Sequence, residues 1–67
     1  MSGYEIGLSV VDALRGIEST PTGVDIAYGY AGGYLDALHD LGVIDDEEMD
    51  LLTAGKDEAK RQALSRI

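Results

Sequence analysis

Three residues in one short segment of this sequence, Asp36, His39 and Asp40, have types and spacing that can bind a metal ion. If the segment is a helix, separations of three and four residues place two carboxylates and an imidazole on one face. No second group of metal ligands accompanies them in the sequence. We therefore interpret them as a solvated polar face with His39 near its ordinary pKa, and we expect no metal site and no cofactor.

The acidic run from Asp45 to Asp50, with the sequence DDEEMD, is a second candidate for metal binding. A calcium-binding loop alternates its oxygen ligands and has a central glycine, and this run has neither feature. Asp45 is instead suited to capping a helix, and acidic residues in the turn that follows are favourable at the positive end of the helix dipole. The run therefore predicts the start of a helix.

Catalysis by a nucleophilic side chain is not expected. The chain has no cysteine, and its serines lie far in sequence from the single histidine, His39. A small helical domain also has little room for a pocket of about 300 Å³, the lower end of the range for ligand sites. We infer from the sequence that the protein is not an enzyme.

Tyr28, Tyr30 and Tyr34 could stack on nucleic-acid bases, but sites of that kind are surrounded by basic residues. This chain has 13 acidic and 5 basic residues and a net charge of −8, so we expect no direct binding of nucleic acid. Tyr30 and Tyr34 are expected in the core or at an interface, with buried rings. Tyr28 is expected to be an exposed contact, because it lies at the edge of a broad apolar arc on the second helix. The arc consists of Ile26, Ala27, Tyr30, Ala31, Tyr34, Leu35, Ala37, Leu38 and Leu41.

Charge is unevenly distributed along the chain. Residues 1–54 contain eleven acidic residues and one basic residue, whereas residues 55–67 have a net charge of +2. Such a field repels nucleic acids and anionic membranes and attracts basic protein surfaces. No apolar run approaches the ~20 residues needed to cross a bilayer, and no signal peptide is recognisable. We expect a cytoplasmic protein that does not bind membranes.

An all-α fold is predicted: one small domain over residues 1–67 with three helices, the second and third forming a tight antiparallel hairpin. The capping-box sequence SGYE starts a first helix that runs from about Gly3 to between Arg15 and Glu18. The third helix follows Asp45 and is expected to bend at Gly55, which could also break it.

The second helix is predicted from near Thr22, which opens another capping box, to Leu41. An alternative start has Thr20 as the cap and Pro21 as the first helical residue. Three glycines on the polar face weaken this helix by roughly 1 kcal/mol each relative to alanine. Residues 28–33 are therefore either a kink or loop, or a helix whose glycines serve another purpose.

The corner between the second and third helices is strongly specified. Gly42 lies where a helix end needs a left-handed residue, a conformation that glycine adopts at little cost. Leu38 and Val43 then take the two positions that touch in a Schellman ending. Asp45 caps the third helix, with Glu48 as its capping-box partner.

Self-association is expected because a short chain without disulfides has a small core. The glycines of the second helix offer a surface for it. Gly29, Gly33 and Ala37 are spaced four residues apart, a pattern that lets another backbone approach closely, although it is best known from membranes. We predict a homo-oligomer with these three residues at its contact.

Residues 35–52 resemble the short helical hairpin called SHOCT, which is found at the ends of some bacterial proteins and is often linked to oligomerisation. The residues that carry the resemblance are Leu35, Leu38, Gly42, Ile44, Glu47, Glu48 and Met49. The family usually has an aromatic residue where Met49 stands and a basic residue where Thr53 stands. The resemblance covers about a quarter of the chain and implies a helical hairpin with a part in oligomerisation.

The function that we expect is that of a non-enzymatic acidic binding protein. The leading hypothesis is an inhibitor that occupies a basic, nucleic-acid-binding surface of a larger bacterial protein; size and charge fit small phage anti-defence proteins, including some anti-CRISPR proteins. The alternative is an oligomerisation module whose acidity serves solubility only. The residues predicted to contact the partner are Tyr28, Asp36, Asp40, Asp46, Glu47 and Asp50.

Overall fold

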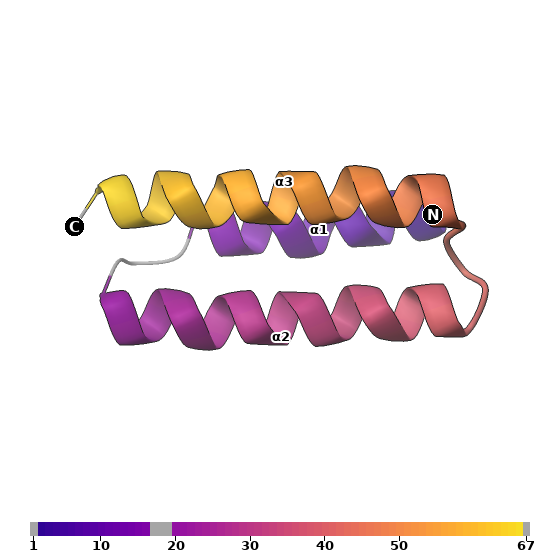
Figure 1. The fold of residues 1–67 in the computed structure, drawn as a ribbon, viewed down its shortest axis with the longest axis horizontal. Coiled ribbons are helices and arrows are strands. Elements are labelled where there is room, and N and C mark those ends of the chain that lie inside the picture. The colour runs from indigo at the N-terminus through magenta and orange to yellow at the C-terminus, as the bar shows by residue number, and fades with distance from the viewer. Residues whose placement is uncertain (1, 17–19, 67) are drawn as a thin grey trace.

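The computed structural model describes residues 2–16 and 20–66, in which three helices form. Helix α1 spans Gly3–Arg15, α2 spans Pro21–Asp40 and α3 spans Asp46–Ser65. α2 runs antiparallel to both other helices, so that α1 and α3 are parallel (Figure 1). With three helices and no strand in the described part of the chain, the predicted all-α fold is confirmed.

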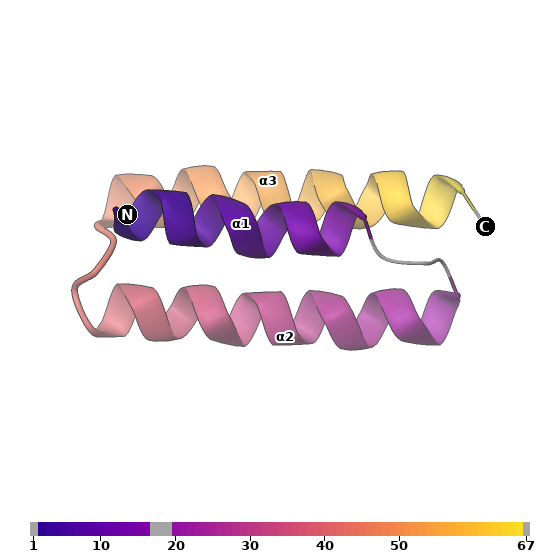
Figure 2. The same cartoon turned by 180° about the vertical axis from the view of Figure 1, so that it is seen from behind.

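α1 is the short member of this bundle, with 13 residues against 20 in each of the other helices. Seen from behind, it lies along α3 and accompanies α2 for only part of its length (Figure 2). It ends at Arg15, within the predicted range, and the outer limit of that range, Glu18, lies outside the described residues. Part of α2 is therefore left without a helix on its α1 side.

The helix starts follow their capping signals. The Ser2 hydroxyl accepts the Glu5 amide at 3.2 Å, and the Glu5 carboxylate accepts the Ser2 amide at 3.2 Å. Thr20 caps α2 by accepting the Gly23 amide at 3.1 Å, and Pro21 is the first helical residue. Of the two caps that the sequence offers, the structure uses Thr20, and α2 begins at Pro21, near residue 22 as predicted, since proline tolerates the first helical position.

The corner between α2 and α3 has the predicted form. Gly42 has a φ of +73°. The Val43 amide donates to the Leu38 carbonyl at 2.9 Å, and the Gly42 amide donates to the His39 carbonyl at 3.0 Å, as in a Schellman ending. The Asp45 carboxylate accepts the amide three residues on, at 2.8 Å. These bonds satisfy both helix ends and set α3 antiparallel to α2.

Gly42→Val is expected to destabilise the fold by about 1–2 kcal/mol, because a β-branched residue is strained in the left-handed region. The control is Gly29→Val, since an added Cβ there meets no atom within 4 Å and the site is helical. Thermal unfolding by circular dichroism should show a lower melting temperature for Gly42→Val alone. Equal melting of the two variants would contradict the assigned corner.

Both open questions about helix continuity are answered by the structure. Residues 28–33 lie within α2, so the kink or loop is excluded, and α3 runs through Gly55 without interruption. Gly55 faces α1, where an added Cβ would lie 3.6 Å from the Val11 side chain. The side of α3 that faces the core therefore tolerates a glycine, because tertiary packing there supports the helix.

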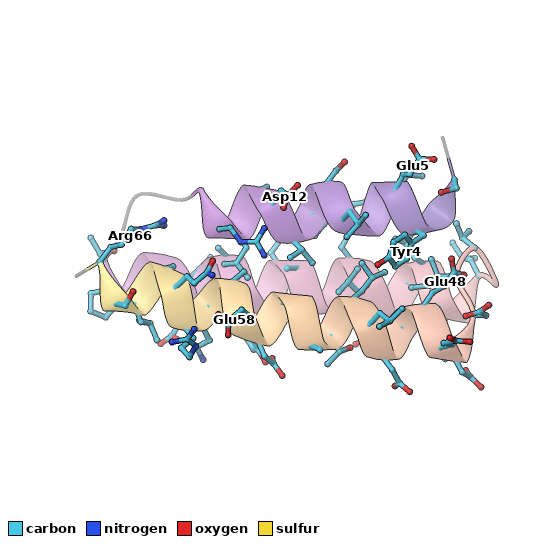
Figure 3. The ribbon with its side chains drawn as sticks, turned by 90° about the horizontal axis from the view of Figure 1, so that it is seen from above. Tyr4, Glu5, Asp12, Glu48, Glu58 and Arg66 are labelled. Carbon is cyan, nitrogen blue, oxygen red and sulfur yellow. The ribbon has the colours of Figure 1, made fainter. Side chains whose placement is uncertain are left out.

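The core lies between all three helices and consists of buried aliphatic side chains. Its members are Val11, Leu14, Val24, Ala31, Leu35, Leu38, Ile44, Leu52, Ala59 and Ala63. Tyr4 packs against its edge from α1, and Figure 3 shows its ring between α1 and α3. No polar or charged residue among the described ones is buried, so apolar packing alone fills this interior.

The apolar arc predicted for α2 is broader than the surface that α2 buries. Ile26, Tyr30 and Leu41 are 69%, 73% and 78% exposed. Tyr30 is therefore not in the core of a single chain, and its predicted place at an interface stays a prediction. α2 is rotated so that its buried stripe runs through Val24, Ala31 and Leu35, which leaves one side of the arc open beside α1.

The glycines at close helix contacts are Gly3 and Gly7 on α1. A Cβ added at Gly3 would clash with the Val43 carbonyl oxygen in the corner, and one at Gly7 would lie 2.5 Å from Leu52 Cδ1. Cβ atoms added at Gly29 or Gly33 would meet nothing within 4 Å. Within one chain, α1 is therefore the helix whose glycines allow close packing. The contact predicted at the α2 glycines concerns a second copy and stays a prediction.

Candidate functional site

The five predicted carboxylates gather on the two sides of the α2–α3 corner. Asp36 and Asp40 occupy the last turns of α2, and Asp46, Glu47 and Asp50 occupy the first turns of α3. All five residues are exposed. The hairpin therefore brings together acids that are up to fourteen positions apart in the sequence.

Four of these five carboxylates have no partner. Asp36, Asp40, Glu47 and Asp50 make no hydrogen bond or ion pair with any residue that the structure describes. The other described acids each have one: Glu5, Asp12, Asp25, Asp45, Asp46, Glu48, Asp57 and Glu58. Unneutralised negative charge is thus concentrated at the corner end of the bundle.

His39 couples the two sides of this acidic end. Its Nε2 lies 2.5 Å from the Asp46 Oδ1, so the ring donates to this carboxylate when Nε2 carries a proton. This hydrogen bond raises the pKa of His39 above its ordinary value, and the charges of Asp46, Asp40 and Asp36 act in the same direction. The expectation that His39 would titrate near its ordinary pKa is therefore wrong.

Asp46→Asn is expected to lower the pKa of His39 towards 6.5, measured by NMR titration of the imidazole. Because the folded-state pKa is raised, the stability from this pair is fully present below pH ~6.5 and is lost as the pH rises through the folded pKa. The variant should lose that part of the pH dependence of melting. An unchanged His39 titration in Asp46→Asn would exclude the contact.

Tyr28 lies apart from the acidic end, in the contact between α2 and α3. It is half-buried, and its hydroxyl donates to the Asp57 carboxylate at 2.5 Å. The Nζ atoms of Lys56 and Lys60 lie 4.5 and 4.4 Å from its ring centroid. The hydrogen bond to Asp57 raises the pKa of Tyr28 above its ordinary value. The structure does not bring Tyr28 together with the five carboxylates.

Lysine and arginine side chains of α3 and α1 pair with acidic residues elsewhere in the bundle. Lys60 Nζ lies 3.7 Å from an Asp25 oxygen, and Arg61 pairs with Glu58, which lowers the pKa of that carboxyl. On α1, the Arg15 guanidinium donates to Asp12 at 2.7 Å. Figure 3 shows the contrast along the bundle, with Glu48 at the corner end and Arg66 at the other end.

A second feature, an apolar groove of about 660 Å³, lies between α1 and α2. Its lining includes Ile6, Val10 and Ala13 on α1 and Ile26, Tyr30 and Tyr34 on α2. The sequence argument that so small a domain has little room for a pocket was therefore wrong. The spacing of four and three residues in Ile6, Val10 and Ala13 was the available signal for a second apolar stripe on α1.

The predicted self-association residues share the outer face of α2. Gly29, Gly33 and Ala37 are exposed, and the space above both glycines is open. Asp36 and Asp40 lie on the neighbouring side of the same helix. A second backbone could therefore reach the glycines, and the homo-oligomer stays a prediction.

Within residues 2–16 and 20–66, no three histidine, aspartate or glutamate side chains lie in positions that could hold a metal ion. None of the helices in this part of the chain has the length and apolar character needed to cross a bilayer. Comparisons with protein-family models, with curated proteins and with solved structures found no match to this chain.

Proposed function

We propose that this protein is a non-enzymatic binding protein whose acidic corner end occupies a basic surface of a larger protein. A basic surface that normally binds nucleic acid is the target class, because spaced carboxylates at a rigid corner resemble a short row of phosphates in charge. The protein would then act as an inhibitor by blocking that surface, as small phage anti-defence proteins do.

The single observation that supports this proposal is the lack of internal partners at the corner end. A carboxylate that already pairs with a lysine or arginine has little left to offer a second cation. Asp36, Asp40, Glu47 and Asp50 are unpaired, whereas the acids along the rest of the described chain are paired or cap a helix. Folding does not require these four charges, and an acid near the C-terminus of α2 is mildly unfavourable.

Exposed charge pairs are individually weak, at about 0–1 kcal/mol each. The proposal therefore relies on the joint field of several carboxylates, which acts mainly on the association rate and is screened by salt. Binding of this kind should be fast at low ionic strength and should weaken steeply as salt rises. It should also be competed by double-stranded DNA, which offers the same charges to the same surface.

The test is capture of proteins from a bacterial lysate with the chain immobilised through the C-terminal end, which lies opposite the corner (Figure 1). Captured proteins are identified by mass spectrometry and eluted with DNA. Asp36→Asn with Asp40→Asn should slow association of the captured partner by roughly tenfold at low salt, the low end for electrostatic steering. Surface plasmon resonance measures this rate, and the salt dependence should flatten.

The matched control is Asp12→Asn with Asp25→Asn, which changes the net charge equally but removes carboxylates that already pair with Arg15 and Lys60. Helicity and melting should be nearly unchanged in both double variants. If the control slows association as much as the corner variant, only net charge matters and the corner is not the binding site. If neither variant changes binding, the acidic surface plays no part in it.

A second candidate function is oligomerisation through the outer face of α2, favoured by the open space above Gly29 and Gly33. At Gly33 an added Cβ meets no atom within 4 Å, so Gly33→Leu should be tolerated by the monomer and should dissociate an oligomer closed there. Sedimentation at high micromolar concentration measures the effect. A monomer that Gly33→Leu leaves unchanged would exclude this function.

A further inference from the structure

We propose that the apolar groove between α1 and α2 binds an amphipathic helix with basic flanks from a partner protein. The inference rests on the proposed function, because it names the element of the basic partner that this chain would hold. Helix-in-groove recognition places apolar side chains of one helix face, spaced three to four residues apart, into a groove between two helices.

The groove has the dimensions of such a helix. On α1 its lining extends from Ile6 to Leu14, and on α2 from Gly23 to Tyr34. At a rise of 1.5 Å per residue, these segments are about 12 and 17 Å long, enough for about two to three turns of a third helix. A volume of about 660 Å³ exceeds what one apolar side chain fills and accommodates anchors from successive turns.

Exposed apolar side chains mark the α2 wall of this groove. Ile26, Tyr30 and Tyr34 line it, and all three are classed with the exposed large apolar residues of the described chain. The rings of Tyr30 and Tyr34 contact each other with centroids 6.4 Å apart. Apolar area gathered in one groove and rimmed by polar residues is the usual character of a binding surface.

The charges around the groove select a basic occupant. Arg15 is the one lysine or arginine on the described parts of α1 and α2, and its guanidinium donates to Asp12 at 2.7 Å and to Gln62 of α3 at 3.0 Å. Among the described residues, no acidic one lines the groove itself. The two helices that form it carry five acidic residues, Glu5, Asp12, Asp25, Asp36 and Asp40, so their joint field favours a basic occupant.

A second copy of this chain is a less suitable occupant. Each copy has a net charge of −8, so that two copies repel each other when their α1–α2 faces meet. A helix with apolar anchors and lysines or arginines along its flanks satisfies both the groove and the net negative charge of the two helices that form it.

The test uses three synthetic helical peptides of identical length and the full chain, isotopically labelled for NMR. The first has leucines spaced three and four residues apart, with lysines elsewhere. The second has the same composition, scrambled so that no apolar face forms. The third has glutamates in place of the lysines. The first peptide should shift the amide signals of Val10, Ala27 and Tyr30 and should bind at least about tenfold tighter than the other two.

Variants of the groove give an independent readout. Tyr30→Ala and Ile26→Ala remove exposed groove side chains and should each weaken binding of the first peptide by about fivefold to tenfold. Leu51→Ala is the matched control, because Leu51 is an exposed apolar residue on α3 outside the groove. Circular dichroism should show equal helicity in all three variants, and the control should bind like the wild type.

The outcomes separate failure of this inference from failure of the proposed function. If the scrambled lysine peptide binds as tightly as the patterned one, the groove is not used and the acidic binding function stands. If no lysine peptide binds at low salt, both proposals fall. If the glutamate peptide binds equally well, the occupant is not basic. A dimer that Tyr30→Ala dissociates in sedimentation would assign the groove to a second copy and overturn the inference.

Discussion

Leu35→Ala is expected to lower the free energy of unfolding by about 2–5 kcal/mol, the largest effect among the changes considered. Leu35 is 0% exposed and lies in the core cluster, so its loss removes apolar burial and leaves a cavity. A domain of this length has a total stability of about 3–10 kcal/mol. The substitution therefore removes a large share of the stability or all of it.

Thermal unfolding by circular dichroism measures this effect, and the melting temperature should fall by roughly 10 °C or more. The control is Leu41→Ala, which removes the same number of atoms from an exposed side chain of the same segment. That change should alter stability by less than about 0.5 kcal/mol. Equal melting of the two variants would show that the core does not pass through Leu35.

Gly7→Val is expected to destabilise the protein by about 1–3 kcal/mol through overpacking. A Cβ at Gly7 would lie 2.5 Å from Leu52 Cδ1 and 3.3 Å from Leu35 Cδ2, and valine adds two further methyl groups. Leu52 and Leu35 are both fully buried, so their side chains have no free space into which to move. The overpacking would be relieved by separation of α1 from the α2–α3 hairpin.

The measurement is again thermal melting, with Gly29→Val as the control for the same substitution in an open helical position. Valine has a slightly better helix propensity than glycine, so the control should melt at or just above the wild-type temperature. If Gly7→Val melted with Gly29→Val, α1 would not lie as close to α3 as described. The pair therefore tests which helix uses its glycines for close packing.

Local chemistry made most of the fold predictable. Ser2, Gly42 and Asp45 act on backbone groups within a few residues of themselves, so their roles depend on the neighbouring sequence alone. The starts of α1 and α3 and the corner followed from these residues. The start of α2 near residue 22 was also predictable, but the sequence left open which threonine is the cap, because Thr20 and Thr22 are both good caps; the structure uses Thr20.

Rotation of the helices about their axes was not predictable from periodicity. Gly3 and Gly7 have the same four-residue spacing as Gly29 and Gly33, and only the packed bundle shows which pair faces another helix. The apolar arc of α2 is wider than one neighbouring helix can cover. Which part stays open depends on how α2 is rotated about its axis in the bundle, and the groove lies along that open side, next to α1.

The candidate site was predictable only in part, because the spacing of its acids is local whereas their pairing depends on how the helices pack. A helical spacing of four residues placed Asp36 beside Asp40 and Asp46 beside Asp50, and the corner brought the two pairs to one end. Which acids would be unpaired depends on where the lysines of α3 fall against α2. That register also placed Tyr28 beneath Lys56 and Lys60.

The separation of charge along the bundle also gives the molecule an electric dipole moment parallel to its longest dimension, 35 Å. Unpaired carboxylates lie at the corner end, and Lys60, Arg61 and Arg66 lie towards the other. In the field of a basic surface, such a dipole experiences a torque that turns the corner forward while the two molecules are still diffusing. Fewer collisions are then lost to wrong orientations, and added salt would randomise the approach before it weakened any contact.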